Sequence, residues 1–251
     1  MTRYVTPLRE GGSLPAIVEA DDDGMYVLKF RAAGHGGLAL VAELVAGEIG
    51  RALDLPVPEI VFATLDAELA RTEPDPEIHA LMYDSAGLNL ALDYLPGSVT
   101  FDPAVHRIPD DLASRIVWFD AFVSNVDRTP RNTNMLMWHR APWLIDHGST
   151  LYFHHSPGWE GQAGRSRDPF RPIRDHVLLP SARRLHEEDG ALARVLKPDV
   201  IEEIVDRVPA AWLEERAGDT SPENLRAAYV RYLLDRLAEP RSFVEEALGA
   251  R

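Results

Sequence analysis

The sequence predicts an α+β fold with two lobes, a β-rich N-terminal part and a mainly helical C-terminal part. Residues 1–95 contain several alternating or β-branched stretches bounded by turn residues, which is typical of strands. From Ile108 onward, apolar residues recur at helical spacing behind starts rich in proline and acidic residues. We therefore expect the lobes to comprise residues 1–95 and 96–251.

The N-terminal part should begin with β-structure over residues 3–30. There SLPAIVEA and MYVLKF flank the turn-forming cluster DDDG, as in a hairpin. The next run, LALVAELVAGEIGRAL, is apolar almost all round, as expected of a helix buried on most sides, and the prolines of LPVP end it. EIVFATLD and LNLALDYLPGS predict two more strands, with a short helix from Pro76 to Asp84 between them.

The C-terminal part should be built from amphipathic helices around one hairpin. PDDLASRIVWFDAFVSN predicts a helix because it starts with proline and two acidic residues. MLMW and PWLID, on either side of His139 and Arg140, predict the hairpin. The segment from Tyr152 to Pro180 has no clear element and should form a mobile loop. Its arginines could recognise phosphate or acidic groups, or pair with nearby carboxylates.

Composition excludes several kinds of site and partner. The chain has no cysteine, which excludes disulfides, thiolate metal sites and a cysteine nucleophile, and agrees with a reducing compartment. No stretch approaches the roughly 18 apolar residues that a membrane span requires, and the N-terminus has no signal-peptide pattern. A net charge of −14 would repel nucleic acid and anionic lipid. We therefore expect a cytoplasmic protein with no nucleic-acid and no membrane partner.

Polar residues suited to phosphoryl transfer concentrate in residues 116–150. Asp127 is followed five positions later by Asn132, and an Asp-His-Gly triplet begins at Asp146. In kinases, an Asp orients the attacking hydroxyl, an Asn five residues later binds one magnesium ion, and a later Asp-x-Gly binds the other. Asp127 is thus a candidate catalytic base, and Asn132 and Asp146 are candidate ligands of Mg²⁺, which prefers oxygen. Asn134 is an alternative ligand, because the register of the hairpin is unknown.

A lysine, a glutamate and an arginine could complete this set. Lys29 is one of two lysines in the chain and lies in an apolar strand, although it could also occupy a solvated strand face. Glu43 has apolar residues at its helical neighbour positions, so it must face water, find a partner elsewhere or shift its pKa. A strand lysine paired to a helix glutamate is the kinase arrangement. Arg128 could clamp a phosphate or support its loop by pairing with a carboxylate.

Two backbone segments are candidates for binding a nucleotide. A glycine-rich turn can bring its N–H groups close to a phosphate, although such turns are often only turns. An extended connection between the lobes could offer its backbone to the adenine edge. The segments are Gly11, Gly12 and Ser13 near the N-terminus, and Asp93, Tyr94 and Leu95 at the predicted boundary between the lobes.

VSNVDRTPRN followed by LIDHG resembles the catalytic loop and metal motif of HipA-like kinases, where the loop runs Asn-x-Asp-Arg-His-x-x-Asn. The resemblance also covers YVLKF, the LVAEL helix and its LPVP ending, about residues 10–150. It implies a two-lobed protein-kinase-like fold that transfers the γ-phosphate of ATP, commonly to a protein serine or threonine. The roles implied by position are a catalytic base at Asp127, magnesium ligands at Asn132 and Asp146, a phosphate contact at Lys29 and its partner at Glu43.

Two residues depart from this family pattern. Thr129 replaces the histidine after Asp-Arg, and His147 replaces the aromatic or acidic residue after the metal-binding Asp, but neither change removes a ligand. The chain is also much shorter than the HipA toxin itself. We therefore expect a compact stand-alone relative, to which toxin activity and an antitoxin partner are not carried over. The phosphate acceptor, a protein or a small molecule, is not identified by the sequence.

Other functions remain open. The chain could be a nucleotide-binding pseudokinase, against which the complete set of catalytic residue types argues. It could be a small-molecule or lipid-type kinase, since related loops occur in phosphatidylinositol kinases. A metal hydrolase could use Asp146, His147, His154 and His155. The adjacent histidines disfavour it, because neighbours on a strand point to opposite faces.

Overall fold

The computed structural model describes residues 1–8, 14–162, 164–217 and 220–251, apart from the side chains of Thr72 and of residues 215–217. The strands are β1 (Arg3–Pro7), β2 (Ala16–Glu19), β3 (Met25–Lys29), β4 (Ile60–Leu65), β5 (Gly87–Asp93), β6 (Val99–Thr100), β7 (Met135–Trp138) and β8 (Ala141–Leu144). The α-helices are α1 (Gly37–Ala52), α2 (Pro76–Asp84), α3 (Asp110–Phe122), α4 (Leu185–Val195), α5 (Pro198–Asp206), α6 (Ala210–Ala217), α7 (Pro222–Leu237) and α8 (Ser242–Ala250). The 3₁₀ helices are η1 (Ala67–Thr72), η2 (Tyr152–His155), η3 (Trp159–Gly161), η4 (Arg165–Arg167), η5 (Arg171–Asp175) and η6 (Leu179–Ser181).

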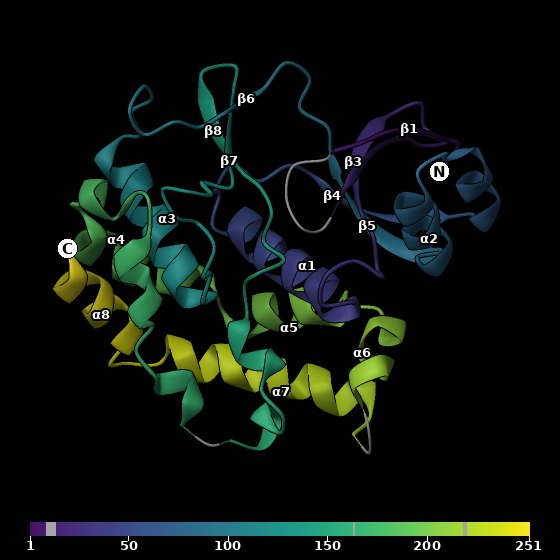
Figure 1. Ribbon diagram of the computed structural model, residues 1–251. Helices are drawn as coiled ribbons and strands as arrows, with labels where there is room; N and C mark the ends of the chain where they lie inside the picture. Colours follow the sequence, from purple (N-terminus) through teal and green to yellow (C-terminus); the bar gives the residue numbers. More distant parts are fainter. Residues whose placement is uncertain (9–13, 163, 218–219) are drawn as a thin grey trace.

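An antiparallel sheet forms the N-terminal part, with the strand order β1-β2-β3-β5-β4 (Figure 1). Ala16 pairs with Leu28 across β2 and β3, which confirms the predicted hairpin. Ile78 and Met82 of α2 are buried in one apolar cluster with Leu28, so α2 packs against this sheet. The predicted bounds of α2, from Pro76 to Asp84, are confirmed, because proline can begin a helix but cannot continue one.

Helix α1 lies between the sheet and the C-terminal helices. A Cβ atom on Gly47 would lie 2.4 Å from Cδ1 of Ile60 in β4, and one on Gly37 would lie 2.7 Å from the carbonyl oxygen of Trp212 in α6. Both glycines therefore permit close packing, Gly37 of the start of α1 against α6 and Gly47 of its second half against β4. The apolar residues of α1 join the larger cluster that continues through the helical part. The boundary between residues 95 and 96 stays a prediction, and α1 shares its core with the residues beyond that boundary.

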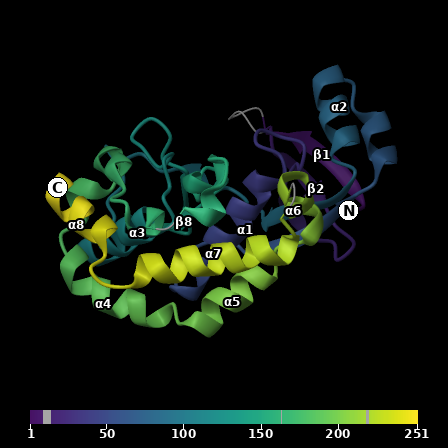
Figure 2. The same ribbon diagram turned by 90° about the horizontal axis from the view of Figure 1, so that it is seen from below.

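The C-terminal part is mainly helical, which confirms the predicted α+β class. Helices α5 and α7 run side by side along one face, and α3 packs against α4 and α8 (Figure 2). Trp118 and Phe122 of α3 and Phe243 of α8 are fully buried and form ring contacts there. Among the described helices, none has the length and apolar character needed to cross a bilayer.

The predicted hairpin of β7 and β8 is confirmed, with Met135 opposite Leu144. The two-residue strand β6 adds to it, a pairing too short to leave a pattern in the sequence. The prediction that residues 152–180 lack regular elements is wrong, because η2 to η5 lie within this segment and η6 begins there. Phe153 stacks on Tyr232 of α7 at 3.5 Å between ring centroids, and Ile173 is buried. Apolar anchors at irregular spacing hold this segment to the helices.

Candidate active site

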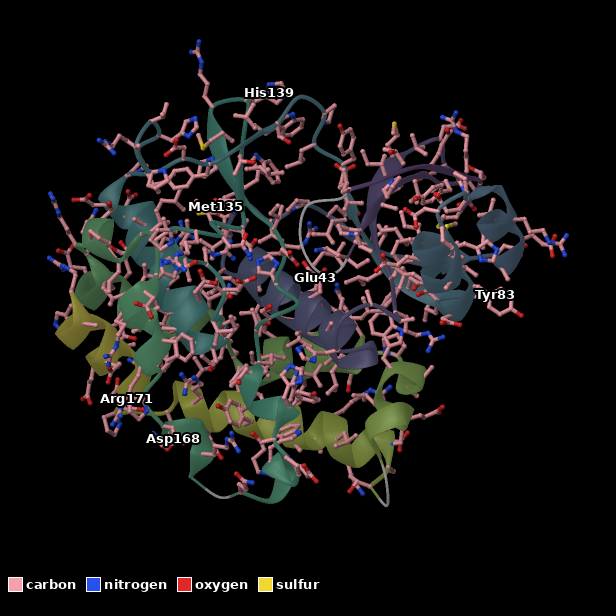
Figure 3. All side chains as sticks on the ribbon, in the orientation of Figure 1. Glu43, Tyr83, Met135, His139, Asp168 and Arg171 are labelled. Carbon is pink, nitrogen blue, oxygen red and sulfur yellow. The ribbon has the colours of Figure 1, made fainter. Side chains whose placement is uncertain are left out.

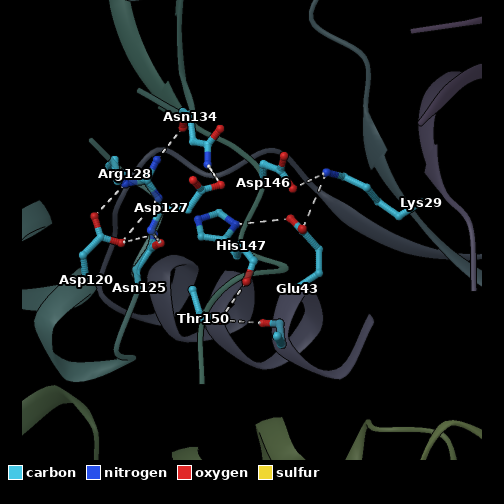
Figure 4. Close-up of polar contacts among 11 residues, drawn as sticks. Lys29, Glu43, Asp120, Asn125, Asp127, Arg128, Asn134, Asp146, His147 and Thr150 are labelled. Carbon is cyan, nitrogen blue, oxygen red and sulfur yellow. Dashed lines mark hydrogen bonds and ion pairs between the residues drawn. The ribbon is translucent and has the colours of Figure 1, made fainter. Parts of the chain in front are cut away.

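A lysine and two carboxylates converge where the sheet, α1 and the segment after β8 meet. Lys29 ends β3, Glu43 lies in α1, and Asp146 follows β8. The Lys29 Nζ atom lies 2.8 Å from Asp146 Oδ1 and 3.7 Å from Glu43 Oε2 (Figure 4). The structure therefore brings the strand lysine and the helix glutamate together, and Lys29 is shared with Asp146.

Burial and opposite charge act against each other in this group. Burial by itself would lower the pKa of Lys29, but the carboxylates of Glu43 and Asp146 outweigh it and raise that pKa. Burial by itself would raise the pKa of Glu43, but the Lys29 ammonium and the hydrogen bond with His147 lower it to about 2. Lys29 and Glu43 are therefore both charged at neutral pH.

The residues after β8 fasten the site to α1. His147, which is fully buried, donates from Nδ1 to Glu43 Oε1 at 3.3 Å, and its Nε2 atom has no partner among the described residues. The hydroxyl of Thr150 donates to the carbonyl oxygens of His147 and Ala42 at 2.7 and 3.3 Å. Asp146 has a φ of 58°, a left-handed conformation that non-glycine residues rarely adopt and that clusters at functional sites.

The loop between α3 and β7 holds Asp127 in one orientation. Asp127 Oδ2 accepts hydrogen bonds from Nδ2 of Asn132 at 2.8 Å and from Nδ2 of Asn134 at 3.1 Å. The Asp127 N–H group donates to Asn125 Oδ1 at 3.0 Å. Among the described residues, none donates a hydrogen bond to Asp127 Oδ1. This oxygen is therefore the one that could accept a proton from a substrate.

Arg128 supports this loop from the interior of the protein. Its guanidinium is fully buried, donates from Nε to Asp120 Oδ2 at 2.6 Å, and also donates to the carbonyl oxygen of Asn134. Of the two roles that the sequence leaves open for Arg128, pairing with a carboxylate is the one that this geometry favours. Arg128 is therefore a positioning residue and not a catalytic one, because its guanidinium is enclosed by Asp120 and the carbonyl of Asn134.

Asp120 lies at the centre of this support. It accepts from Nδ2 of Asn125 at 2.7 Å and from Nε2 of His176 at 2.8 Å, in addition to Arg128. The Nδ1 atom of His176 accepts the N–H of Leu178, which leaves the proton of the neutral ring on Nε2. Burial by itself would raise the pKa of Asp120, but Arg128 and His176 hold it well below its ordinary value. Asp120 therefore stays charged.

The predicted nucleotide segments are placed only in part. Gly11, Gly12 and Ser13 lie outside the described residues. Asp93 and Tyr94 donate their N–H groups to the carbonyl oxygens of Glu59 and Met25, at 2.9 and 3.0 Å. For the N–H of Leu95, the described part of the chain offers no acceptor within hydrogen-bonding distance. Of the three amides, this one is left without a described hydrogen-bond partner, and Leu95 itself is buried.

The family model described as HipA-like kinase matches residues 2–246. The chain belongs to the HipA-like kinase family. Its fold is similar to that of the Helicobacter pylori proinflammatory kinase CtkA, with a TM-score of 0.59 and 14% sequence identity, over 98% of this chain and 97% of that one. It is also similar to the Golgi casein kinase, with a TM-score of 0.50 and 12% identity, over 100% of this chain and 72% of that one. No curated protein matches the chain by sequence.

These findings confirm the predicted family and the protein-kinase-like fold, and they support a kinase-type phosphotransferase.

The donor atoms of this HipA-like kinase fit a cation held between protein and phosphate. Asn132 uses Nδ2 to bind Asp127, which leaves Oδ1 for a cation, and Asp146 binds Lys29 through Oδ1, which leaves Oδ2. The Asp146 side chain is 38% exposed, so a ligand can reach it. Magnesium is typically held by such a small oxygen set with substrate phosphates.

The metal-hydrolase alternative has little support in this HipA-like kinase. Across residues 1–8, 14–162, 164–217 and 220–251, no cluster of three or more His, Cys, Asp or Glu side chains is placed to hold a metal ion.

The sequence reasoning missed three residues that shape the site. Asp120 interrupts the apolar run IVWFDAFV, and a carboxylate among such neighbours indicates a buried pair. For His147 the sequence suggests only a departure from the family pattern and a ligand of the alternative hydrolase site, whereas the structure places it against Glu43. His176 carries no pattern of its own, because its contact with Asp120 joins residues that are far apart in the chain.

Proposed function

We propose that this HipA-like kinase is an ATP- and Mg²⁺-dependent phosphotransferase that acts on a serine or threonine hydroxyl of a protein. The observation that carries the proposal is the shared lysine, whose Nζ atom lies 2.8 Å from Asp146 and 3.7 Å from Glu43. This arrangement has the parts of a kinase phosphate site, a strand lysine paired with a helix glutamate beside an acidic metal ligand.

Asp127 would act as the catalytic base. ATP with magnesium would supply the phosphoryl group when bound. The hydroxyl oxygen of the acceptor would bond to the γ-phosphorus as the bond from that phosphorus to the β–γ bridging oxygen breaks, and ADP would leave. The hydroxyl proton would pass to Asp127 Oδ1, because Oδ2 is held by two amide groups.

The remaining residues would bind and orient the nucleotide. Asn132 Oδ1 and Asp146 Oδ2 would hold the cation, and Lys29, kept in place by Glu43, would contact the phosphates. Asp93, Tyr94 and Leu95 would form the adenine edge of the site, with the Leu95 N–H as the donor. Gly11, Gly12 and Ser13 remain the proposed phosphate turn. Arg128 would position Asp127 through the loop.

The first test measures the melting temperature with ATP, with Mg²⁺ and with both. Ligand at about 100 times its dissociation constant adds about 2.7 kcal/mol, which should raise the midpoint by roughly 5 to 10 °C. Asp146→Asn should abolish the rise that needs both. If the melting temperature does not rise with ATP, with Mg²⁺ or with both, the proposed nucleotide site would be overturned.

The second test measures phosphate transfer. Asp127→Asn keeps the shape of the side chain but removes the base, and should lower transfer by about 10²- to 10⁴-fold without changing the ATP–Mg²⁺ stabilisation. Asp206→Asn, an exposed position on α5, is the matched control. Stabilisation by ATP and Mg²⁺ without any transfer by the wild type would favour a pseudokinase.

A further inference from the structure

A pocket of about 850 Å³ lies against the catalytic loop, separate from the residues proposed to bind ATP. One wall is the loop itself, with Thr129, Pro130 and Arg131. The other walls come from η5 and the residues after it, and from the end of α8. None of the proposed nucleotide or metal ligands that the structure describes lines this hollow, so it is not the nucleotide site.

The pocket and the candidate base belong to one turn. Thr129 donates its N–H to the carbonyl oxygens of Asp127 and Asn132, each at 2.9 Å, and accepts the N–H of Asn132 at 3.2 Å. Pro130 and Arg131 form the tip of this turn. A ligand that binds Arg131 is therefore held one residue from a proposed metal ligand and a few residues from the proposed base.

The lining is rich in arginine, although the chain as a whole is strongly acidic. Arg131, Arg174 and Arg251 line the pocket, against the single acidic side chain of Asp175 among its described lining residues. In the part of the chain that the structure describes, Arg131 has no hydrogen-bond or ion-pair partner. Arg174 Nη2 lies 3.7 Å from Glu246 Oε1 with 59% of its side chain exposed, a weak surface pair. Arg131 and the exposed end of Arg174 are therefore available to an anionic ligand, whereas Arg251 donates from Nη1 to the carbonyl oxygen of Ala182 at 3.3 Å.

The two main walls are tied to the same buried support. Val177 donates its N–H to the carbonyl oxygen of Arg128 at 3.1 Å, and His176 donates from Nε2 to Asp120 at 2.8 Å. Arg128 and Asp120 in turn hold the catalytic loop. The wall that carries Arg174 is thus fixed relative to the wall that carries Arg131, and both are fixed relative to Asp127.

We propose that this arginine pocket binds an acidic segment of the acceptor protein, next to the serine or threonine that receives the phosphate. Arginine binds carboxylates through charge-assisted, often paired hydrogen bonds. The net charge of −14 would repel an acidic peptide elsewhere on the surface, so the pocket would select both the segment and its position. This inference rests on the proposed phosphotransferase function and names the class of its substrate.

The experiment uses short fluorescent peptides with one central serine and a pair of glutamates placed in turn at each flanking position. Each peptide has a twin with glutamine in place of glutamate. At least one glutamate peptide should bind the full chain about tenfold more tightly than its twin. Arg131→Gln and Arg174→Gln should each weaken that binding by about three- to tenfold, and added salt should weaken it further.

Arg71→Gln is the matched control, because it removes the same charge from an exposed position in η1. It should leave peptide binding unchanged, and none of these variants should change the stabilisation by ATP and Mg²⁺. Equal binding of every glutamate peptide and its twin would overturn the proposal. A loss in Arg71→Gln as large as in Arg131→Gln would overturn it as well.

Phosphate transfer to the same peptides separates this proposal from the function on which it rests. Transfer to glutamate and glutamine peptides with equal kcat/KM would leave the kinase function standing and overturn the arginine pocket. Arginine-dependent binding of a glutamate peptide without transfer would support the pocket and count against the phosphotransferase. A lower KM for the glutamate peptide than for its glutamine twin, with this difference lost in Arg131→Gln, would support both the phosphotransferase function and the arginine pocket.

Discussion

Two clusters of buried charge flank the catalytic loop, and they differ in how fully their polar atoms are bonded. The closed cluster consists of Asp120, Asn125, Arg128 and His176, all buried, with Asp120 accepting from the other three. The open cluster consists of Lys29, Glu43, Asp146 and His147. There one lysine serves two carboxylates, Asp146 is 38% exposed, and His147 Nε2 has no described partner (Figure 4).

This difference separates support from ligand binding. A buried charge that is fully hydrogen-bonded has no capacity left for a ligand, so the closed cluster can only hold the loop in place. The open cluster keeps carboxylate oxygens and a lysine in a position where phosphate and a cation could complete them. Figure 3 shows the surrounding region filled with side chains, with Glu43 near the centre of the molecule. The predictions below test whether the two clusters really divide these tasks.

The largest effect should come from breaking the closed cluster. Asp120→Ala leaves Arg128 buried without its carboxylate, which should destabilise the ligand-free protein by about 3–5 kcal/mol. For a chain of this size, that corresponds to a fall in melting temperature of roughly 6 to 20 °C. Asp146→Ala, in the open cluster, should change stability by about 1 kcal/mol or less. If Asp120→Ala does not fold, Asp120→Asn should give a smaller loss, and equal effects of Asp120→Asn and Asp146→Asn would contradict the comparison.

The next effect concerns pH. The pKa of Glu43 is about 2 in the folded chain against an ordinary value of 4.5, so the unfolded chain binds the extra proton between these pH values. The stability from this group is present above pH 4.5 and is lost as the pH falls toward 2, by roughly 3 kcal/mol in all. Urea midpoints between pH 6 and 3 should fall less steeply in Glu43→Gln than in the wild type. Glu202→Gln, at an exposed position on α5, should keep the wild-type slope.

A double-mutant cycle would measure the pair inside the open cluster. Lys29→Met leaves Glu43 buried with His147 as its described partner, and should destabilise the protein by about 2 kcal/mol. In the Lys29→Met background, Glu43→Gln should destabilise far less than it does in the wild type, because the carboxylate no longer has a cation to pair with. Urea unfolding gives the coupling energy, expected at about 1–2 kcal/mol. If the effects of the two substitutions are additive, the ion pair between Lys29 and Glu43, at 3.7 Å, contributes nothing to stability.

The sequence predicts the elements that local signals define. Prolines and turn residues mark the ends of α1 and α2, and alternation marks the hairpins of β2 with β3 and β7 with β8. Strand β6 and the 3₁₀ helices between Tyr152 and Ser181 were missed, because short elements held by distant aromatic contacts leave no periodic pattern.

The candidate site divides in the same way. The meeting of Lys29 with Glu43 could be predicted, because a rare lysine and an isolated carboxylate each need a partner. The support of the loop could not, since Asp120 and His176 are 56 residues apart and meet only in the folded chain. Arg128 illustrates the limit, because two roles were open until its burial against Asp120 was known.

The smallest expected effect belongs to His147. Its ring lies 5.8 Å from that of Phe119, and His147→Phe would keep this contact while removing the bond from Nδ1 to Glu43. The lost hydrogen bond should destabilise the protein by about 1 kcal/mol. In the wild type, however, the buried Nε2 atom has no described partner, and such an unsatisfied group destabilises a fold by about 1–3 kcal/mol. The variant removes this unfavourable contribution. The two terms offset each other, so stability should change by less than about 1 kcal/mol.

Activity should respond more than stability does, because His147 is one of the two side chains that contact Glu43 through polar atoms in the described part of the chain, and Glu43 orients Lys29. We expect His147→Phe to lower kcat by about three- to tenfold, with little change in the ATP–Mg²⁺ stabilisation. His147→Asn can place an amide N–H near the former Nδ1 and should restore much of kcat, whereas a purely structural role would not distinguish the two variants. Full kcat in His147→Phe would show that Lys29 alone orients Glu43, and would reduce the open cluster to its lysine and two carboxylates.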